Sequence, residues 1–114
     1  MPCIQSRVNI AMTQEQKETV KKELGEAITL IPGKSENWLM IDFADQCDMY
    51  FRGSRETPLA YIEVKAFGTI SEDTAQKLTE RISEIYETQL KIKKDGIYIK
   101  YEEVSKWGWN GNNL

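Results

Sequence analysis

The sequence predicts an α+β fold in which two βαβ units form a four-stranded sheet with both helices on one face. Four segments have strand-like patterns, with apolar and polar residues alternating at 2–10 and 59–67, and apolar residues recur at helical spacing in two further segments. The first strands of the two units, at 2 and 61, and the cores of their second strands, at 38 and 97, have the same spacing. Residue identities barely repeat, so this is a duplication of structure rather than a sequence repeat. Each unit is expected to form a right-handed crossover.

The first unit begins with a strand at 2–10, where apolar side chains alternate with polar ones. Thr13 and Gln16 form a capping-box pattern that predicts the start of a helix. The apolar stripe of this helix is Val20, Leu24, Ala27, Ile28 and Ile31. Pro32-Gly33 follows and ends the helix, and a second strand is predicted at 37–44.

The second unit follows a predicted turn and a short apolar segment, Met49–Phe51, which is predicted to form a strand. A longer strand is expected at 59–67, and Ser71 is a suitable N-cap for the second helix. The apolar stripe of that helix is Ala75, Leu78, Ile82, Ile85 and Tyr86. The last strand is predicted at 97–101, before an aromatic, glycine-rich tail at 107–114.

The sheet face that the helices leave uncovered has a mixed composition. Its predicted residues are Gln5, Arg7, Asn9, Glu63, Lys65 and Lys100, among Trp38, Met40 and Tyr98. This mixture is too polar for a dry core and too apolar for a bare surface, and Met49–Phe51 has no obvious partner strand. Both features favour association of the chain through its sheet edges. The alternative is a solvated sheet face.

Length and charge narrow the function classes. The 114 residues predict a single domain spanning 1–114. Net charge is −3, and the lysines and arginines are spread among acidic residues, which argues against nucleic acid as the main partner. No secretory signal and no membrane-spanning segment are visible, so a cytoplasmic protein that does not bind membranes is expected.

The residue types exclude several kinds of catalytic site. The chain has no histidine and only two cysteines, Cys3 and Cys47, which do not form a CxxC pair. Zinc, haem and Ser-His-Asp chemistry therefore lose their usual ligands and bases. No metal and no cofactor are expected.

Pro2, directly after the initiator methionine, is the most informative residue. Removal of Met1 would leave Pro2 with a free secondary amine. An α-amino group titrates near ~7.7–8.0, and burial or nearby positive charge lowers that value. Such an amine can act as a general base near neutral pH. If Met1 stays attached, the Pro2 nitrogen is a tertiary amide and cannot accept a proton.

Several short motifs, in this order and at this chain length, resemble those of one family. They are Met1-Pro2, Gly33-Lys34, Phe51-Arg52-Gly53-Ser54, Ala66-Phe67-Gly68, Ile97-Tyr98-Ile99 and Trp107-Gly108-Trp109-Asn110-Gly111. Together they resemble the macrophage migration inhibitory factor family of the tautomerase superfamily, over nearly the whole chain. The resemblance implies a homotrimer whose sheets surround a central channel, with active sites between subunits at the N-terminal proline. It also implies keto–enol tautomerisation of small α-keto acids such as phenylpyruvate, and of dopachrome analogues.

The resemblance assigns roles to individual residues. Pro2 resembles the base, Lys34 the group that holds the substrate carboxylate, and Tyr98 the catalytic tyrosine that closes the pocket. Phe67 stands where a backbone N–H meets the substrate. The residues expected to form the rest of the substrate site are Trp38, Trp107, Trp109 and Lys100. Without the resemblance, Lys34 would be a solvated turn residue, Tyr98 a packed strand residue, and the tryptophans core or interface residues.

The chain departs from the family pattern at three places. Lys100 replaces an asparagine that often binds substrate; a second cation there would favour a more anionic substrate, or would be solvated. Thr57-Pro58-Leu59-Ala60 lacks the CxxC of the best-known member, so a thiol oxidoreductase activity has no basis here. Leu114 ends the chain where an aromatic residue often lines the site.

Two alternatives to a tautomerase remain open at the level of sequence. The first is a cytokine-like protein that binds an unidentified receptor, with weak or no catalysis; family resemblance also allows export without a signal. The second is decarboxylation or dehalogenation by the same amine, for which Arg7 is the nearest candidate partner in the sequence.

Overall fold

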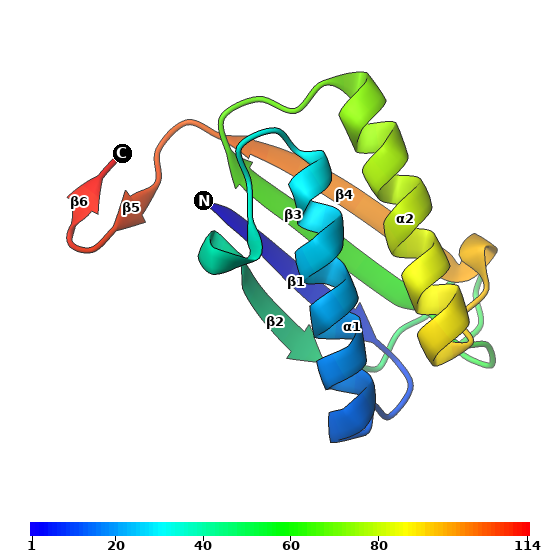
Figure 1. Ribbon diagram of the computed structural model, residues 1–114. Helices are drawn as coiled ribbons and strands as arrows, with labels where there is room; N and C mark the ends of the chain where they lie inside the picture. The colour runs from blue at the N-terminus through cyan, green and yellow to red at the C-terminus, as the bar shows by residue number, and fades with distance from the viewer.

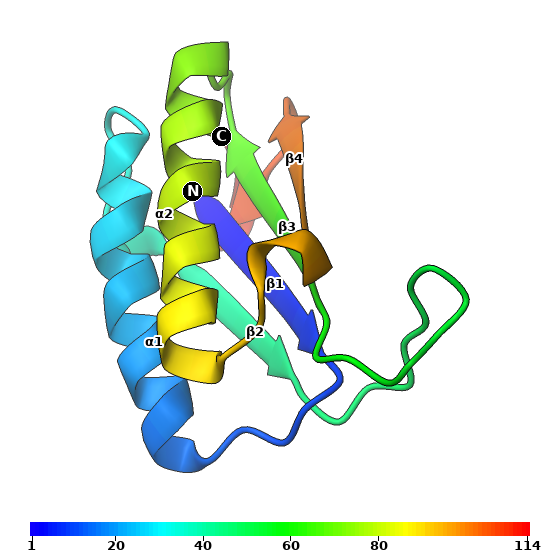
Figure 2. The same ribbon diagram turned by 90° about the vertical axis from the view of Figure 1, so that its right-hand side faces the viewer.

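The computed structural model describes all residues from 1 to 114. It contains a four-stranded sheet in the order β2-β1-β3-β4, with two long helices on one face (Figures 1 and 2). The elements are β1 (Pro2–Val8), α1 (Gln14–Ala27), β2 (Met40–Ala44), β3 (Ala60–Phe67), α2 (Glu72–Leu90) and β4 (Ile97–Val104). β1 pairs in parallel with β2, and β3 with β4, whereas the central β1–β3 pair is antiparallel. The predicted pair of βαβ units is confirmed.

The predicted N-caps of both helices are confirmed. The Thr13 hydroxyl accepts a hydrogen bond from the Gln16 backbone N–H, and the Gln16 side chain accepts one from the Thr13 N–H. The Ser71 hydroxyl accepts a bond from the Thr74 N–H at the start of α2. These bonds satisfy N–H groups that have no partner inside the helix, so the sequence fixes where each helix begins.

The core lies between the helices and the sheet. Its fully buried members include Ile4, Val8, Val20, Leu24, Ile28, Ile62, Val64, Leu78, Ile82, Ile85 and Tyr86. The one buried polar residue, Ser6 on β1, accepts a 2.6 Å hydrogen bond from the Tyr86 hydroxyl on α2. Two hydroxyl groups that would each be unsatisfied alone therefore pair across the helix–sheet boundary. Neither helix has the uninterrupted apolar length that a bilayer crossing requires.

Two predicted strands are shorter than expected. β1 ends at Val8. The Asn9 side chain, in place of its backbone carbonyl, accepts a 2.7 Å bond from the Leu59 N–H, and it donates a 2.9 Å bond to the Thr57 carbonyl. β2 begins at Met40, opposite Cys3, and Glu36–Trp38 form a 3-10 helix instead of strand. One residue earlier the partner would be Pro2, which has no N–H to donate.

The strand predicted at Met49–Phe51 is wrong. Only an isolated bridge forms there, in which Phe51 and Ser54 exchange backbone bonds of 2.8 and 3.0 Å. Arg52 and Gly53 between them both have positive φ, 54° and 75°, so this is a tight turn. It lies at the tip of a loop that projects from the sheet (Figure 2). This three-residue apolar segment therefore has no strand partner within the chain, and its Tyr50 side chain stays 64% exposed.

The C-terminal tail forms a structure that the sequence interpretation did not specify. β4 runs three residues beyond the predicted end, to Val104, and the tail then folds into a hairpin of β5 (Gly108–Trp109) and β6 (Asn112–Asn113). Asn110 and Gly111 supply the two positive φ angles of its turn, 53° and 79°. Asn-Gly is the preferred sequence for such a turn, so the signal was present. The hairpin extends away from the sheet (Figure 1).

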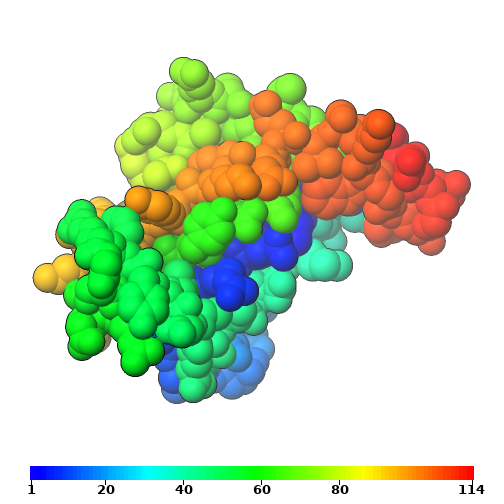
Figure 3. Space-filling model, turned by 180° about the vertical axis from the view of Figure 1, so that it is seen from behind, coloured from blue at the N-terminus to red at the C-terminus, as the bar shows by residue number.

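The second face of the sheet carries no helix (Figure 3). Its side chains are those of Cys3, Gln5, Arg7, Met40, Asp42, Tyr61, Glu63, Lys65, Tyr98, Lys100 and Glu102, as the pairing registers place them in rows. We call this surface the open face. Tyr98 and Met40 are its most exposed apolar members, at 61% and 70%. Seven of the nine residues predicted for this face lie on it, whereas Asn9 follows the end of β1 and Trp38 lies in the 3-10 helix before β2, both outside the four strands.

Candidate active site

The candidate site is built around Pro2, the first residue of β1. Pro2 is buried and lies opposite Ala66 of β3 in the antiparallel ladder. The Phe67 N–H donates a 3.0 Å hydrogen bond to the Met1 carbonyl, the group attached to the Pro2 nitrogen. The backbone N–H of Phe67 therefore points at the group that is bonded to the Pro2 nitrogen.

Lys34 lies beside the same strand end. Gly33, with φ of +81°, turns the chain after the first helix, and the Lys34 N–H donates to the Ile31 carbonyl at 3.1 Å. The Lys34 ammonium then donates a 2.8 Å bond to the Phe67 carbonyl oxygen. Lys34 is only partly exposed and forms no ion pair. Its charge is therefore held in place and remains available to an anion.

The electrostatic surroundings at this corner disfavour a protonated amine. Burial, together with the charge and the hydrogen bond of Lys34, lowers the pKa of the Met1 α-amino group below its usual value. The positive form loses hydration on burial and is repelled by a nearby cation. The same two causes would act on an amine at Pro2, one residue further into the site.

An aromatic cleft of about 760 Å³ opens next to Pro2. Trp38 comes from the 3-10 helix before β2, and Trp107 and Trp109 from the C-terminal hairpin. Trp38 and Trp109 make an edge-to-face contact, with ring centroids 5.0 Å apart and planes at 88°. Both rings stay about half exposed, at 46% and 48%. They offer an apolar wall of a size that suits an aromatic ligand.

Besides Met1 and Gly108, the lining of this cleft includes residues from β1, from β2 and from the segment just before β2 that the sequence analysis did not assign to the site. They are Cys3, Asn37, Leu39 and Met40. Each is a sequence neighbour of Pro2 or Trp38, and the parallel pairing of β1 with β2 brings the two groups together. The pairing register was the missing information, because sequence alone does not align Cys3 with Met40.

Tyr98 lies at the far end of the sheet from Pro2 in the same chain. It shares a row with Arg7 and Tyr61, and Arg7 is five residues along β1 from Pro2. At about 3.3 Å per residue this separates Tyr98 from Pro2 by roughly 17 Å along the strand direction. Tyr98 packs edge-to-face on Phe51, with centroids 5.2 Å apart. Arg7, the sequence-based candidate partner of the amine, lies at this distant end too.

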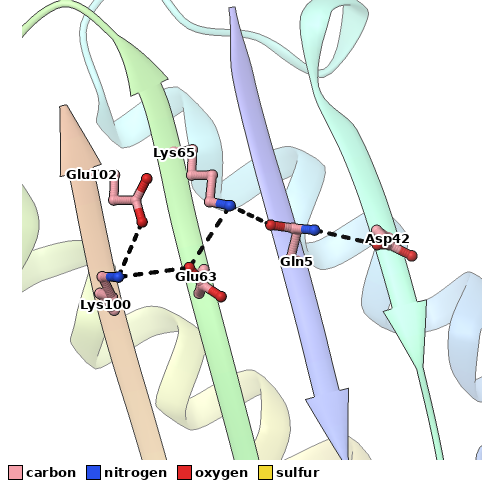
Figure 4. Close-up of polar contacts among 6 residues, drawn as sticks. All are labelled: Gln5, Asp42, Glu63, Lys65, Lys100 and Glu102. Atoms are coloured by element: carbon pink, nitrogen blue, oxygen red, sulfur yellow. Dashed lines mark hydrogen bonds and ion pairs between the residues drawn. The ribbon is translucent and has the colours of Figure 1, made fainter. Parts of the chain in front are cut away.

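Lys100 is also separate from Pro2 within one chain. Its ammonium lies 3.1 Å from the Glu102 carboxylate and 3.9 Å from that of Glu63 (Figure 4). The hydrogen bond and charge of Glu102 raise the pKa of Lys100, so the lysine stays protonated. Glu63 also pairs with Lys65, which donates to Gln5, which in turn donates to Asp42 (Figure 4).

These contacts form one polar chain across all four strands of the open face. Within one protein molecule, one corner of the sheet thus contains Pro2, Lys34, Phe67 and the three tryptophans. Tyr98 and Lys100 lie away from that corner, on the open face.

The Pro2 corner has the parts needed for proton transfer beside a carbonyl group. It offers a buried position for an amine, a fixed cation and a backbone N–H donor, next to an apolar wall. A carboxylate ligand would find its counter-charge at Lys34, and an enolate oxygen would find a donor in the Phe67 N–H once the Met1 carbonyl no longer accepts that bond.

Comparison with known proteins gives consistent results. The family model described as macrophage migration inhibitory factor matches residues 1–114. The structure resembles Leishmania major MIF2, with 27% identity, 100% and 97% of the two chains covered, and a TM-score of 0.92. It resembles Toxoplasma gondii macrophage migration inhibitory factor at 25% identity, with 98% and 99% covered and a TM-score of 0.89.

A structure described as an R7 fused 4-OT wild type asymmetric trimer is 15% identical, with 97% and 94% covered and a TM-score of 0.85; that likeness concerns the fold alone. No curated protein sequence matches the chain.

Proposed function

The chain belongs to the macrophage migration inhibitory factor family, within the tautomerase superfamily, and on this basis we propose that it is a cofactor-independent keto–enol tautomerase. The proposed base is the amine of Pro2 after removal of Met1. The observation that carries the proposal is the convergence of the Lys34 ammonium and the Phe67 N–H on the buried start of β1.

The proposed reaction interconverts the keto and enol forms of a small α-keto acid such as phenylpyruvate. The Pro2 nitrogen takes a proton from the carbon next to the ketone, and the electron pair of that C–H bond moves into the enolate. The same proton is then delivered to the enolate oxygen. Lys34 binds the substrate carboxylate, and the substrate's aromatic ring packs against Trp38, Trp107 and Trp109. Positioned acid–base catalysis of this kind contributes about 10²–10⁴-fold.

Removal of Met1 would supply two of the required groups at once. It converts the Pro2 nitrogen from a tertiary amide into a secondary amine. It also takes away the carbonyl group that accepts the Phe67 N–H bond, which frees that donor for a substrate oxygen. The burial and the Lys34 charge that lower the pKa of the Met1 amine would act on a Pro2 amine in the same direction, which favours its unprotonated form.

We further propose that the chain works as a homotrimer in which Tyr98 and Lys100 of one copy approach Pro2 of the next. In one chain these residues lie at opposite ends of the sheet, and the open face is uncovered. Phe51 and Tyr98 would then form the second wall of the site. Light scattering coupled to size-exclusion chromatography tests the assembly: a monomer in solution would contradict this arrangement.

The central test is phenylpyruvate tautomerisation, followed by ultraviolet absorbance, with intact mass measured on the same sample. Pro2→Ala, and a separate variant with one residue added before Pro2, are expected to lose turnover while circular dichroism and assembly stay unchanged. Wild-type turnover in either variant would refute the role of Pro2. If the native protein retains Met1, Pro2 cannot act as a base, and the receptor-binding alternative would then be favoured.

A further inference from the structure

A second concave site lies away from the Pro2 cleft, between the loop after residue 51 and the turn that follows α2. Its volume is about 500 Å³, and it shares no residue with the Pro2 cleft. Its lining consists of Phe51, Arg52, Ser54, Thr57, Pro58, Lys91, Lys93, Asp95 and Gly96. We call it the basic hollow, because three cations and a single carboxylate face it.

The cations of the basic hollow have no carboxylate partners. Arg52, Lys91 and Lys93 take part in none of the ion pairs of the structure. The Arg52 guanidinium lies over the Phe51 ring, 5.0 Å from its centroid, which orients it without neutralising it. Although the whole protein has a net charge of −3, the basic hollow contains three positive charges without carboxylate partners. Such a place attracts anions.

Two of these cations occupy backbone positions that ordinarily suit glycine or asparagine. Lys91 is the C-cap of α2, in the left-handed region with φ of 56°. Arg52 is the first central residue of the tight turn, with φ of 54°. Side chains with a Cβ cost energy in this region, and C-caps and turns of these kinds favour glycine or asparagine. Long cationic side chains at both positions break the local rule, which is typical of functional positions.

The two walls of the basic hollow are held against each other. A Cβ atom at Gly96 would lie 2.9 Å from the Pro58 carbonyl oxygen, so the two backbone segments are in close contact. The Phe51–Ser54 bridge fixes the turn that carries Arg52. The cations are therefore carried on a backbone frame already built before any ligand binds, which lowers the entropy cost of binding.

We propose that the basic hollow binds the phosphate group of a small phosphorylated ligand. A phosphate monoester carries close to two negative charges at neutral pH and three acceptor oxygens. Arg52 can donate two parallel N–H bonds to such a group, Lys91 and Lys93 add point charges, and the hydroxyls of Ser54 and Thr57 are further donors. Within one chain this site shares no residue with the Pro2 cleft, and it shares only Phe51 with the second wall proposed for the assembled trimer.

The test is an NMR titration of the ¹⁵N-labelled full-length protein with inorganic pyrophosphate at low ionic strength, with sodium acetate as the monoanionic control. Saturable amide shifts are expected in residues 51–58 and 91–96, at pyrophosphate concentrations where acetate has no effect. Shifts spread over lysines across the whole surface, or equal responses to acetate, would show charge screening alone and overturn the proposal.

Variants separate binding from folding. Arg52→Asn combined with Lys91→Asn removes two charges and places the better residue type at both left-handed positions, so the Tm is expected to stay the same or rise. Pyrophosphate binding is expected to weaken at least tenfold. Lys93→Gln, at a position with ordinary backbone (φ −65°), is expected to weaken binding as well.

The control for the double variant is Lys22→Gln combined with Lys77→Gln, which removes the same charge from the exposed surfaces of α1 and α2. This control is expected to bind as the wild type does. Equal affinity in the Arg52/Lys91 variant and the wild type, or equal weakening in the control, would refute the assignment.

Discussion

The Lys34 ammonium and the Phe67 carbonyl oxygen are joined by a 2.8 Å hydrogen bond that spans two otherwise separate parts of the chain. It ties the turn that follows the first helix to the end of β3. The N–H of the same Phe67 points toward the group attached to Pro2. One residue of β3 therefore positions the cation through its carbonyl and presents a donor through its N–H, so the spacing of both groups is set by the backbone.

We predict that Lys34→Met lowers kcat/KM for phenylpyruvate by about 10–100-fold, because a hydrogen bond to a charged group is worth about 1.5–3 kcal/mol. The rising limb of the pH–kcat/KM profile should also move to higher pH, since loss of a nearby cation raises the pKa of the Pro2 amine. Lys22→Met, on the exposed surface of α1, is the control. An unchanged pH profile would show that Lys34 does not act on the amine.

We predict that Gly111→Ala disturbs the proposed substrate site without unfolding the protein. Gly111 has φ of +79° in the hairpin turn, where an L-residue costs about 1–2 kcal/mol. The hairpin is exposed, so the loss should appear as a shift of Trp109 and a rise in KM, with global stability within about 0.5 kcal/mol of wild type. The matched control is Asn110→Gly, because residue 110 also has a positive φ, 53°, which glycine adopts without strain. Tryptophan fluorescence and steady-state kinetics measure both effects.

Tyr86→Phe should lower the free energy of unfolding by about 1–3 kcal/mol, because it leaves the buried Ser6 hydroxyl without its partner. Urea denaturation at pH 7 measures the change, and the slope with denaturant should stay constant. Combining it with Ser6→Ala should recover part of the loss, since both polar groups are then removed. A double variant that loses the sum of the two single effects would show that the pair does not act as a unit.

The pH dependence of stability above pH 10 should also report Tyr86. Burial raises the pKa of Tyr86 to about 12, with the Ser6 bond acting weakly in the opposite direction. The unfolded tyrosine loses its proton near pH 10, so above that pH the folded state binds more protons and stability falls as pH rises. About 2–3 kcal/mol should be lost between about pH 10 and 12. The Tyr86→Phe variant should lack this part of the decline.

The helix starts and the βαβ order could be read from the sequence because local chemistry determines them. Thr13, Gln16 and Ser71 act through bonds to their own helix, and no distant residue is needed. The error at Met49–Phe51 has the opposite origin, since a strand needs a partner and apolar alternation does not reveal whether one exists. Pro2, Lys34 and Phe67 lie at one corner, and the roles that the resemblance implies for them stay predictions. The neighbours Cys3, Leu39 and Met40 depend on the pairing of β1 with β2, which periodicity does not give.

Because β1 and β3 are antiparallel and β4 is parallel to β3, Pro2 and Tyr98 of one chain lie at opposite ends of the sheet. This separation has a consequence for mixtures of two inactive variants. If each site takes Pro2 from one copy and Tyr98 from another, a Pro2→Ala chain and a Tyr98→Phe chain should complement one another when refolded together. In a ring assembled at random from equal amounts, about a quarter of the sites would combine an intact proline with an intact tyrosine. Recovery of about a quarter of normal turnover would mark a site shared between chains, whereas a site contained within one chain would recover nothing.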